Sequence, residues 1–328
     1  MDAILIFSIA AFFLFGLVFG SFLNVCIYRL PRDLSVVSPR SFCPSCAVPI
    51  AFYDNIPVLS WLILRGRCRN CRARISPRYA VVELLTGVFF VLAYLVPQST
   101  WFAASYIRFM RPVFMPVRVP FEPNALAFQF SVFSFLLIGL IFTDAETKLL
   151  PDLLTKPGIV AGLAFSLWTP VEGPAHLFLR SVHNWRVLSL VNSLSGAILG
   201  AAFILCVALA YEALRGVEGM GRGDVKLMAL IGAFLGVKLT LLVLLLGSLI
   251  GSLFGLLLIV IVWRKRLARR RRRNPGEPSR TARGRAWQSA VLIYRNFEIP
   301  FGVFLGAAAL FSAFCGPALI GWYMQFFV

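Results

Sequence analysis

The sequence predicts an all-α polytopic membrane protein with about eight transmembrane helices and one small extramembrane domain between the first two. Three observations support this fold class. Hydrophobic residues make up 59% of the 328-residue chain, and the mean hydropathy is +0.83. Long apolar runs recur along the whole chain, and the charged residues gather between them. Soluble globular domains have neither this composition nor runs of this length.

Eight apolar runs come near the ~20 residues that a helix needs to cross a bilayer. They are 3–23, 80–97, 125–143, 157–170, 188–211, 225–237, 239–262 and 300–326, and the fourth and sixth are short. The first run has no basic start, since Asp2 is its only early charge, so we expect a retained helix and not a cleaved signal peptide. We divide the chain into a first transmembrane helix (1–23), an extramembrane domain (24–79), a membrane core (80–263), a basic linker (264–297) and a last transmembrane helix (298–328).

Lysine and arginine set the expected orientation, because basic residues accumulate in cytoplasmic connections. Segments 24–79, 144–157, 212–224 and 264–297 carry 9, 2, 2 and 12 basic residues, whereas the alternate segments 98–124 and 171–186 carry 3 and 2. This places the N-terminus outside and the basic loops in the cytoplasm. With eight spans the C-terminus is also outside.

Segment 24–79 contains two CxxC pairs separated by 21 residues. Two such pairs let four thiolates converge on one tetrahedral ion, typically zinc. Two disulfides or four metal-free thiols are the alternatives, and a reducing cytoplasm disfavours the disulfides. We expect a structural, zinc-ribbon-like site that stabilises a domain too short for much hydrophobic core. Its ligands are Cys43, Cys46, Cys68 and Cys71.

Three other connections carry weaker signals. Segment 98–124 is expected to be amphipathic or irregular. Arginines crowd 264–285 among Pro, Gly and Ser, which predicts a disordered stretch that binds anionic lipid headgroups. No nucleic-acid binding is expected there, because aromatic residues are absent between Arg264 and Ala286. The only histidines, His176 and His183, are predicted on the outer side, which excludes histidine-based nucleophilic catalysis on the cytoplasmic face.

Two acids stand at the cytoplasmic ends of predicted helices. Asp144 ends the third span, and Asp224 begins the sixth after a glycine-rich hexamer, Gly219-Met220-Gly221-Arg222-Gly223-Asp224. Acids at such positions are candidates for function. Two neighbouring carboxyls cannot both ionise cheaply, so one keeps a proton while the other activates water, as aspartic proteases require. Alternatively, the same acids serve a transporter or channel as proton or cation sites. Gly221, Gly223, Asp152 and Glu83 are candidate supporting residues.

Several motifs resemble those of the type IV prepilin peptidases, the bifunctional leader peptidases and N-methyltransferases of bacterial membranes. In chain order they are Gly20-Ser21-Phe22-Leu23-Asn24-Val25-Cys26, the two CxxC pairs around Asp54-Asn55-Ile56-Pro57, Ile75-Ser76-Pro77-Arg78-Tyr79, Val82-Glu83-Leu84-Leu85-Thr86, Asp144 with Leu150-Pro151-Asp152, the Gly-Met-Gly-Arg-Gly-Asp hexamer, and Ile299-Pro300-Phe301-Gly302.

The resemblance implies an aspartic endopeptidase of the inner membrane whose catalytic residues are Asp144 and Asp224. Such an enzyme removes the leader peptide of prepilins and pseudopilins on the cytoplasmic side. It then methylates the new N-terminus with S-adenosylmethionine. Its substrates would serve type IV pili, type II secretion or competence.

Overall fold

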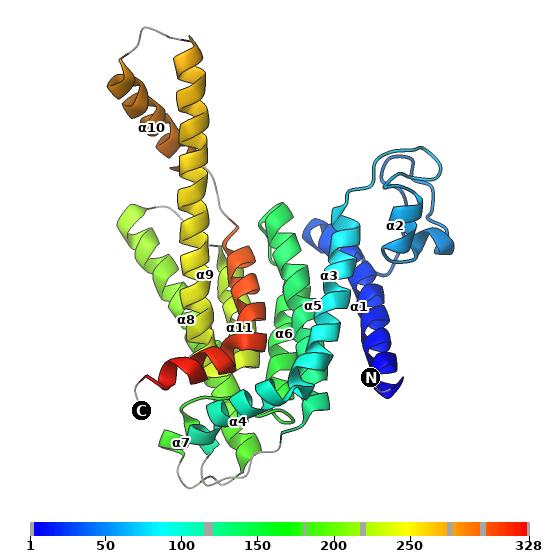
Figure 1. Ribbon diagram of the computed structural model, residues 1–328, viewed down its shortest axis with the longest axis vertical. Helices are drawn as coiled ribbons and strands as arrows, with labels where there is room; N and C mark the ends of the chain where they lie inside the picture. Colours follow the sequence, from blue (N-terminus) through cyan, green and yellow to red (C-terminus); the bar gives the residue numbers. More distant parts are fainter. Residues whose placement is uncertain are drawn as a thin grey trace.

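The computed structural model describes residues 3–114, 121–179, 182, 184–216, 221–273, 278–295 and 300–326 (Figure 1). Within these ranges the chain is helical apart from loops, turns and two isolated β-bridges, which confirms the all-α prediction. The helices are α1 (Ala3–Arg29), η1 (Leu30–Arg32), η2 (Phe52–Asn55), α2 (Leu59–Ile63), α3 (Arg78–Gln98), α4 (Thr100–Phe114), α5 (Pro123–Thr147), α6 (Asp152–Phe165), α7 (Ala175–Phe178), α8 (Trp185–Arg215), α9 (Arg222–Arg273), α10 (Ser279–Arg295) and α11 (Phe301–Met324).

Six helices of the described chain are long and apolar enough to cross a membrane, namely α1, α3, α5, α8, α9 and α11. The predicted eight runs all fall on helices. Two of them share α9, and the short run 157–170 begins inside the 14-residue α6.

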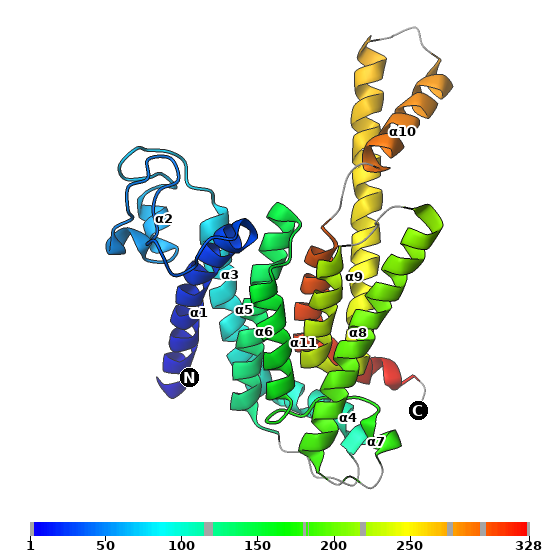
Figure 2. The same ribbon diagram turned by 180° about the vertical axis from the view of Figure 1, so that it is seen from behind.

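The helix α9 contains a reversal at Gly236. Gly236 has φ 73° and ψ −175°, a backbone conformation that is open almost only to glycine. A β-carbon added to Gly200 of α8 would lie 2.7 Å from the carbonyl oxygen of Met228 and 3.2 Å from the Thr240 side chain. A β-carbon at Gly196 would meet Gly232 and Gly236 in the same way. Because α8 passes both halves of α9, α9 is a helical hairpin. Its first half begins, with Asp224, at the end of the bundle where α8 finishes, and its second half runs back toward that end (Figure 2).

The helices α1 and α3 approach closely through small residues. A β-carbon on Gly16 would lie 2.6 Å from the Cα atom of Gly87, and one on Gly20 would lie 2.7 Å from the Cα atom of Glu83. Small residues of this kind let transmembrane helices pack backbone to backbone. The side-chain amide of Asn24 donates to the carbonyl of Tyr79 at 2.9 Å. This hydrogen bond joins α1 and α3 at their ends near the cysteine-containing segment.

Segment 98–124 contains the amphipathic helix α4. Its buried residues Phe102, Tyr106, Phe109 and Met110 recur at helical spacing. The Tyr106 hydroxyl donates to the carbonyl oxygen of Pro170 at 2.6 Å and ties α4 to the loop before α7. Figure 1 shows α4 and α7 at one end of the bundle and the loops around α2 at the other.

The prediction that the arginine-rich stretch 264–285 of the basic linker is disordered is wrong for the described part. The second half of α9 continues to Arg273, and α10 packs back against it. Ala282, Ala286 and Ala290 are buried along the α10 face that meets α9. The Trp263 indole also donates to the Arg283 carbonyl at 3.4 Å. Ser279, Gly284 and Ser289 lie within α10, and the four-residue alanine spacing supplies the packing surface.

Candidate active site and metal centre

Asp144 lies in the C-terminal part of α5 and is 5% exposed. Its Oδ2 atom accepts the Val303 backbone N–H at 3.0 Å, and the backbone N–H of Gly302 donates to the same carboxyl. Gly302 and Val303 stand in the first turn of α11, where helix N–H groups have no partner within the helix. The α11 N-terminus therefore directs two donors and its positive dipole end at Asp144.

Asp224 lies in the first turn of α9 and is 9% exposed. Its carboxyl lies within electrostatic range of Asp144. A β-carbon on Gly302 would lie 2.9 Å from Oδ2 of Asp144 and 3.3 Å from a methyl carbon of Leu227, one turn beyond Asp224. The helices α5, α9 and α11 therefore converge at Gly302. Among the residues that the structure describes, no hydrogen-bond donor to the Asp224 carboxyl is found.

The glycine-rich hexamer is described from Gly221 onward, so Gly219 and Met220 lie outside the described residues. Gly223 packs against the loop between α5 and α6, where an added β-carbon would lie 3.1 Å from Cβ of Leu150. A β-carbon added to Gly221 would have its nearest neighbour, the backbone nitrogen of Gly223, 3.9 Å away. Gly223 thus permits close packing, while Gly221 leaves space before the helix.

Charged residues two positions beyond each aspartate join it to other elements. Glu146 pairs with Arg78 at the start of α3. Lys226 pairs with Asp152 at the start of α6, and Asp152 also binds Lys156 at 2.7 Å. Asp152 therefore braces the helix of Asp224 through Lys226.

Glu83 is buried on α3. Its Oε2 atom accepts the backbone N–H of Val58 at 2.7 Å. Val58 precedes α2 and has a positive φ of 61°. Glu83 therefore ties the cysteine-containing segment to the membrane helix α3.

The four cysteine sulfurs lie within 4.8 Å of one another, and the Sγ atoms of Cys43 and Cys71 are 3.8 Å apart. Sulfurs at the corners of a tetrahedron around an ion 2.3 Å away are separated by about 3.8 Å, so the cluster fits zinc. All four positions are thiols, which is typical of a closed structural site.

Two similar turns present these thiols. The N–H of Cys43 donates to Val48 at 3.0 Å and the N–H of Cys68 donates to Ala73 at 2.9 Å, so each turn closes five residues after its first cysteine. The backbone N–H of Val48, followed by the Asn70 side chain, lowers the pKa of Cys46 to about 7. Backbone N–H groups of Cys71 and Asn70 lower the pKa of Cys68. Lowered pKa values favour the thiolates that bind a metal. Desolvation and the neighbouring thiols, by contrast, raise the pKa of Cys71 to about 11.

A bidentate ion pair braces the second turn. Nε and Nη2 of Arg69 bind the two Asp54 oxygens at 2.7 and 2.6 Å, and the guanidinium holds the pKa of Asp54 below its ordinary value. Asp54 comes from the segment between the two CxxC pairs, so this pair closes the loop onto the cysteine cluster.

Sequence reasoning missed the two α11 amides and the Arg78–Glu146 pair as parts of this site. The Pro300-Phe301-Gly302 sequence signals a helix start, but nothing local indicates that this start meets Asp144. His176 lies on α7, at the end of the bundle opposite the cysteine cluster (Figure 1). His183 lies outside the described residues.

Residues 14–96 match the family model of the bacterial peptidase A24 N-terminal domain, and residues 131–256 match that of the type IV leader peptidase family. Three similar curated proteins each bear the name prepilin leader peptidase/N-methyltransferase. The relative from Aeromonas hydrophila is 32% identical over 340 residues, covering 96% of this chain and 93% of the relative. The Klebsiella pneumoniae relative is 38% identical over 230 residues (68% and 83%), and that from Neisseria gonorrhoeae is 32% identical over 246 residues (68% and 72%). No solved structure matches the chain.

Proposed function

The chain belongs to the type IV leader peptidase family, and from that premise we propose that Asp144 and Asp224 are the catalytic pair of a prepilin leader peptidase. The family relationship favours this function over the transporter alternative. The protein is a prepilin peptidase with N-methyltransferase activity, as its relatives are named, and its substrates are prepilins. The observation that carries the residue assignment is the convergence of α5, α9 and α11 at Gly302, which brings the buried Asp144 and the first turn of α9 with the buried Asp224 to one place.

The surroundings of the two aspartates suggest different roles. An oxygen that accepts a backbone N–H carries no proton on that side, so the donors of Gly302 and Val303 suit the charged form of Asp144. Asp224 lies within electrostatic range of that negative charge, and among the described residues its carboxyl lacks such donors. We assign the charged, water-activating role to Asp144 and the proton-holding role to Asp224.

Cleavage then follows general acid–base chemistry. Asp144 takes a proton from a water molecule held between the carboxyls, and the water oxygen attacks the scissile carbonyl carbon. Asp224 gives its proton to the carbonyl oxygen. In the collapse of this tetrahedral species the C–N bond breaks, the amine leaves with a proton from Asp144, and Asp224 recovers its own from the diol. The leader ends in a carboxylic acid, and the mature pilin begins with a free amine.

Zinc is proposed at Cys43, Cys46, Cys68 and Cys71. The spacing of the sulfurs and the all-thiol ligand set support it. A bound zinc would supply folding free energy to a segment in which few side chains are buried. No step of peptide cleavage depends on it.

S-adenosylmethionine is the proposed methyl donor, because the relatives are named N-methyltransferases. It would supply a methyl group on a sulfonium carrying a positive charge. A pocket of about 490 Å³ lies beside the cysteine cluster, but Arg65, Arg67 and Arg74 line it. Three guanidinium groups do not fit a sulfonium cation, so we derive no step through the donor there.

The proposed location is the bacterial inner membrane, with the N-terminus outside and the aspartates at the cytoplasmic face. Beyond Gly236, α9 runs for 37 residues, or about 55 Å at 1.5 Å per residue. This exceeds a hydrocarbon core of about 30 Å. The basic part at 264–285 therefore extends past the core, where exposed arginines would contact anionic lipid headgroups. We propose no nucleic-acid partner.

The test is incubation of the purified protein with a prepilin, with and without S-adenosylmethionine, followed by measurement of product masses. We expect a leader peptide and a shortened pilin in both samples, and an added methyl mass on the pilin only with the donor. An intact prepilin in both samples would refute the peptidase function. Cleavage without added methyl mass would refute the methyltransferase activity alone.

A further inference from the structure

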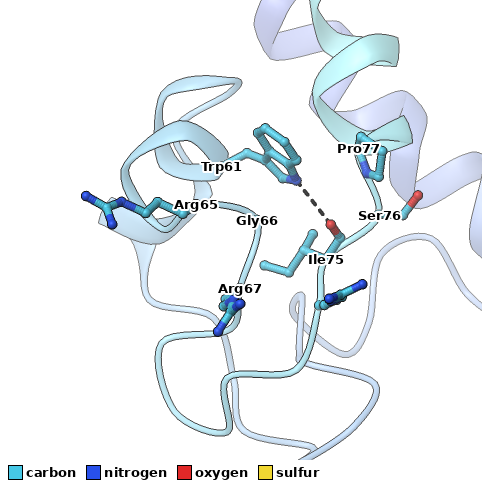
Figure 3. Close-up of a pocket in the computed structure, with 8 residues that line it drawn as sticks. Trp61, Arg65, Gly66, Arg67, Ile75, Ser76 and Pro77 are labelled. Carbon is cyan, nitrogen blue, oxygen red and sulfur yellow. Dashed lines mark hydrogen bonds between the residues drawn. The ribbon is translucent and has the colours of Figure 1, made fainter.

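The pocket beside the cysteine cluster has an apolar floor and a basic rim (Figure 3). The Trp61 indole N–H donates to the Ile75 carbonyl at 3.2 Å, which fixes the ring. Gly66 lies against the indole with φ 62°, and an added β-carbon there would approach the ring to 3.0 Å. The floor is therefore a held aromatic ring, and Arg65, Arg67 and Arg74 are the basic residues of the lining. In Figure 3 the Arg67 side chain lies below the ring, and the Arg65 side chain extends outward from the same turn.

The charge of this pocket is unbalanced. None of its lining residues is an acid, and the ion pairs found in the described chain involve none of its three arginines. The nearby carboxylate of Asp54 is bound to Arg69 instead. Arginine forms bidentate hydrogen bonds with phosphate oxygens, so the rim suits a phosphate-bearing anion.

An exposed apolar surface adjoins the pocket. On α2, the side chains of Leu59, Leu62 and Ile63 are 49, 58 and 66% exposed. This helix contains Trp61 and leads directly to Arg65. Apolar side chains followed by basic ones are typical of protein surfaces that lie at a membrane interface.

The position in the fold agrees with such an interface. Pro77 lines the pocket, and the next residue, Arg78, begins the membrane helix α3. In both views the segment around α2 lies beside the upper ends of α1 and α3, at the edge of the bundle. The pocket therefore lies next in sequence to the start of a helix that is long and apolar enough to cross a membrane.

We propose that this pocket binds the phosphate headgroup of an anionic phospholipid, while Leu62 and Ile63 insert among the acyl chains beneath it. The arginines hold the phosphate, and Trp61 lies at the level of the headgroups, where indole rings are favoured. This contact anchors the cysteine-containing domain to the bilayer at a site separate from the basic part of α9 and α10.

The experiment uses the full-length, zinc-loaded protein in neutral detergent, with bound lipids counted by native mass spectrometry. Arg65→Gln/Arg67→Gln is compared with Arg40→Gln/Arg72→Gln, which removes the same charge from exposed positions of the same domain. We expect the first pair to weaken phosphatidylglycerol binding about tenfold or more and the second by less than twofold, with phosphatidylcholine binding unchanged in both. Arg74→Gln provides an independent variant if the first pair fails to retain zinc.

Two further arms distinguish the source of the phosphate. Leu62→Gln/Ile63→Gln should weaken phosphatidylglycerol binding, and glycerol 3-phosphate should not displace the lipid at equal concentration. Displacement by glycerol 3-phosphate would overturn the proposal in favour of a soluble phosphate ester. Equal loss of lipid in the two arginine pairs, or equal binding of phosphatidylcholine and phosphatidylglycerol, would also overturn it.

Discussion

Cys43 and Cys46 share one turn of the chain and Cys68 and Cys71 share a similar one, whereas Asp144 and Asp224 are 80 residues apart and meet only where three helices converge. The cysteine turns depend on backbone hydrogen bonds within six residues. The aspartates depend on the Gly236 reversal, on the α11 N-terminus and on the ion pairs that brace each helix end. The metal centre is therefore local and would be stabilised by its ion, while the proposed catalytic pair depends on packing of the membrane helices.

The largest effect is expected when either aspartate loses its charge. Asp144→Asn and Asp224→Asn should each reduce leader cleavage by at least about 10³-fold, because an amide can neither accept the proton of water nor hold a transferable one. The rate of leader release, followed by mass, measures this. Asp33→Asn is the control, since this exposed loop residue has φ 54°, which asparagine tolerates. Cleavage at the wild-type rate by either aspartate variant would refute the assignment.

Removal of the metal should affect the cysteine-containing segment and leave the membrane helices around the aspartates folded. With a chelator we expect trypsin to cut at arginines between 40 and 74, because a structural zinc supplies on the order of 10 kcal/mol of folding free energy. The membrane helices should stay intact, and cleavage of prepilin should fall less than in the aspartate variants. Cys206→Ser, outside the cluster, should retain the metal. Resistance of the chelated protein to trypsin at these arginines would show that the domain folds without an ion.

The reversal of α9 offers a way to disturb the aspartates from a distance. Gly236→Ala should lower the free energy of unfolding by about 3 kcal/mol or more, since the φ of 73° disfavours a side chain and an added β-carbon would meet the Glu172 carbonyl. Gly251→Ala in the same helix is the matched control, because its β-carbon would meet nothing closer than 3.5 Å. Thermal unfolding in detergent compares the two, and equal midpoints would contradict the proposed hairpin.

A smaller effect is expected at the Arg78–Glu146 ion pair. It joins the start of α3, which follows the cysteine-containing segment, to the end of α5, which carries Asp144. Arg78 and Glu146 have side chains 14 and 35% exposed, so their ion pair is more protected than that of Lys156 and Asp152, at 67 and 43%. Arg78→Gln or Glu146→Gln should reduce cleavage by about three- to tenfold, whereas Lys156→Gln should change it by less than twofold. The exchanged pair Arg78→Glu/Glu146→Arg should recover part of the loss. Unchanged cleavage in both single variants would show that the Arg78–Glu146 ion pair does not help to position the aspartates.

Most of the membrane helices could be predicted, because an apolar run of sufficient length has few alternatives in a bilayer. The cysteine cluster could be predicted because its turns are local. The basic stretch was misjudged since Pro275, Gly276 and Pro278 suggested disorder. The alanine spacing on α10, at 282, 286 and 290, was the signal that a second helix packs there.

The surroundings of the aspartates were less predictable. The charge of the loops placed Asp144 and Asp224 on one face, and in the structure α5 and the first turns of α9 converge at Gly302. Their contacts with Gly302, Val303 and Arg78 come from residues distant in sequence, and no local pattern specifies such contacts. The catalytic roles of Asp144 and Asp224, and the supporting roles of Gly221, Gly223, Asp152 and Glu83, stay predictions.

The central claim is that Asp144 and Asp224 act together across one water molecule, and thiol cross-linking tests this most directly. The variant is Asp144→Cys/Asp224→Cys in a chain whose Cys26, Cys206 and Cys315 are replaced by alanine, with zinc retained in the cluster. Bridging methanethiosulfonates of increasing length are applied, and cross-linked masses are measured, with Asp144→Cys/Asp152→Cys as the control pair. We predict that the shortest reagent links residues 144 and 224 but not the control pair. Linkage of 144 and 224 only by the longest reagents, or by none, would contradict the shared-water mechanism.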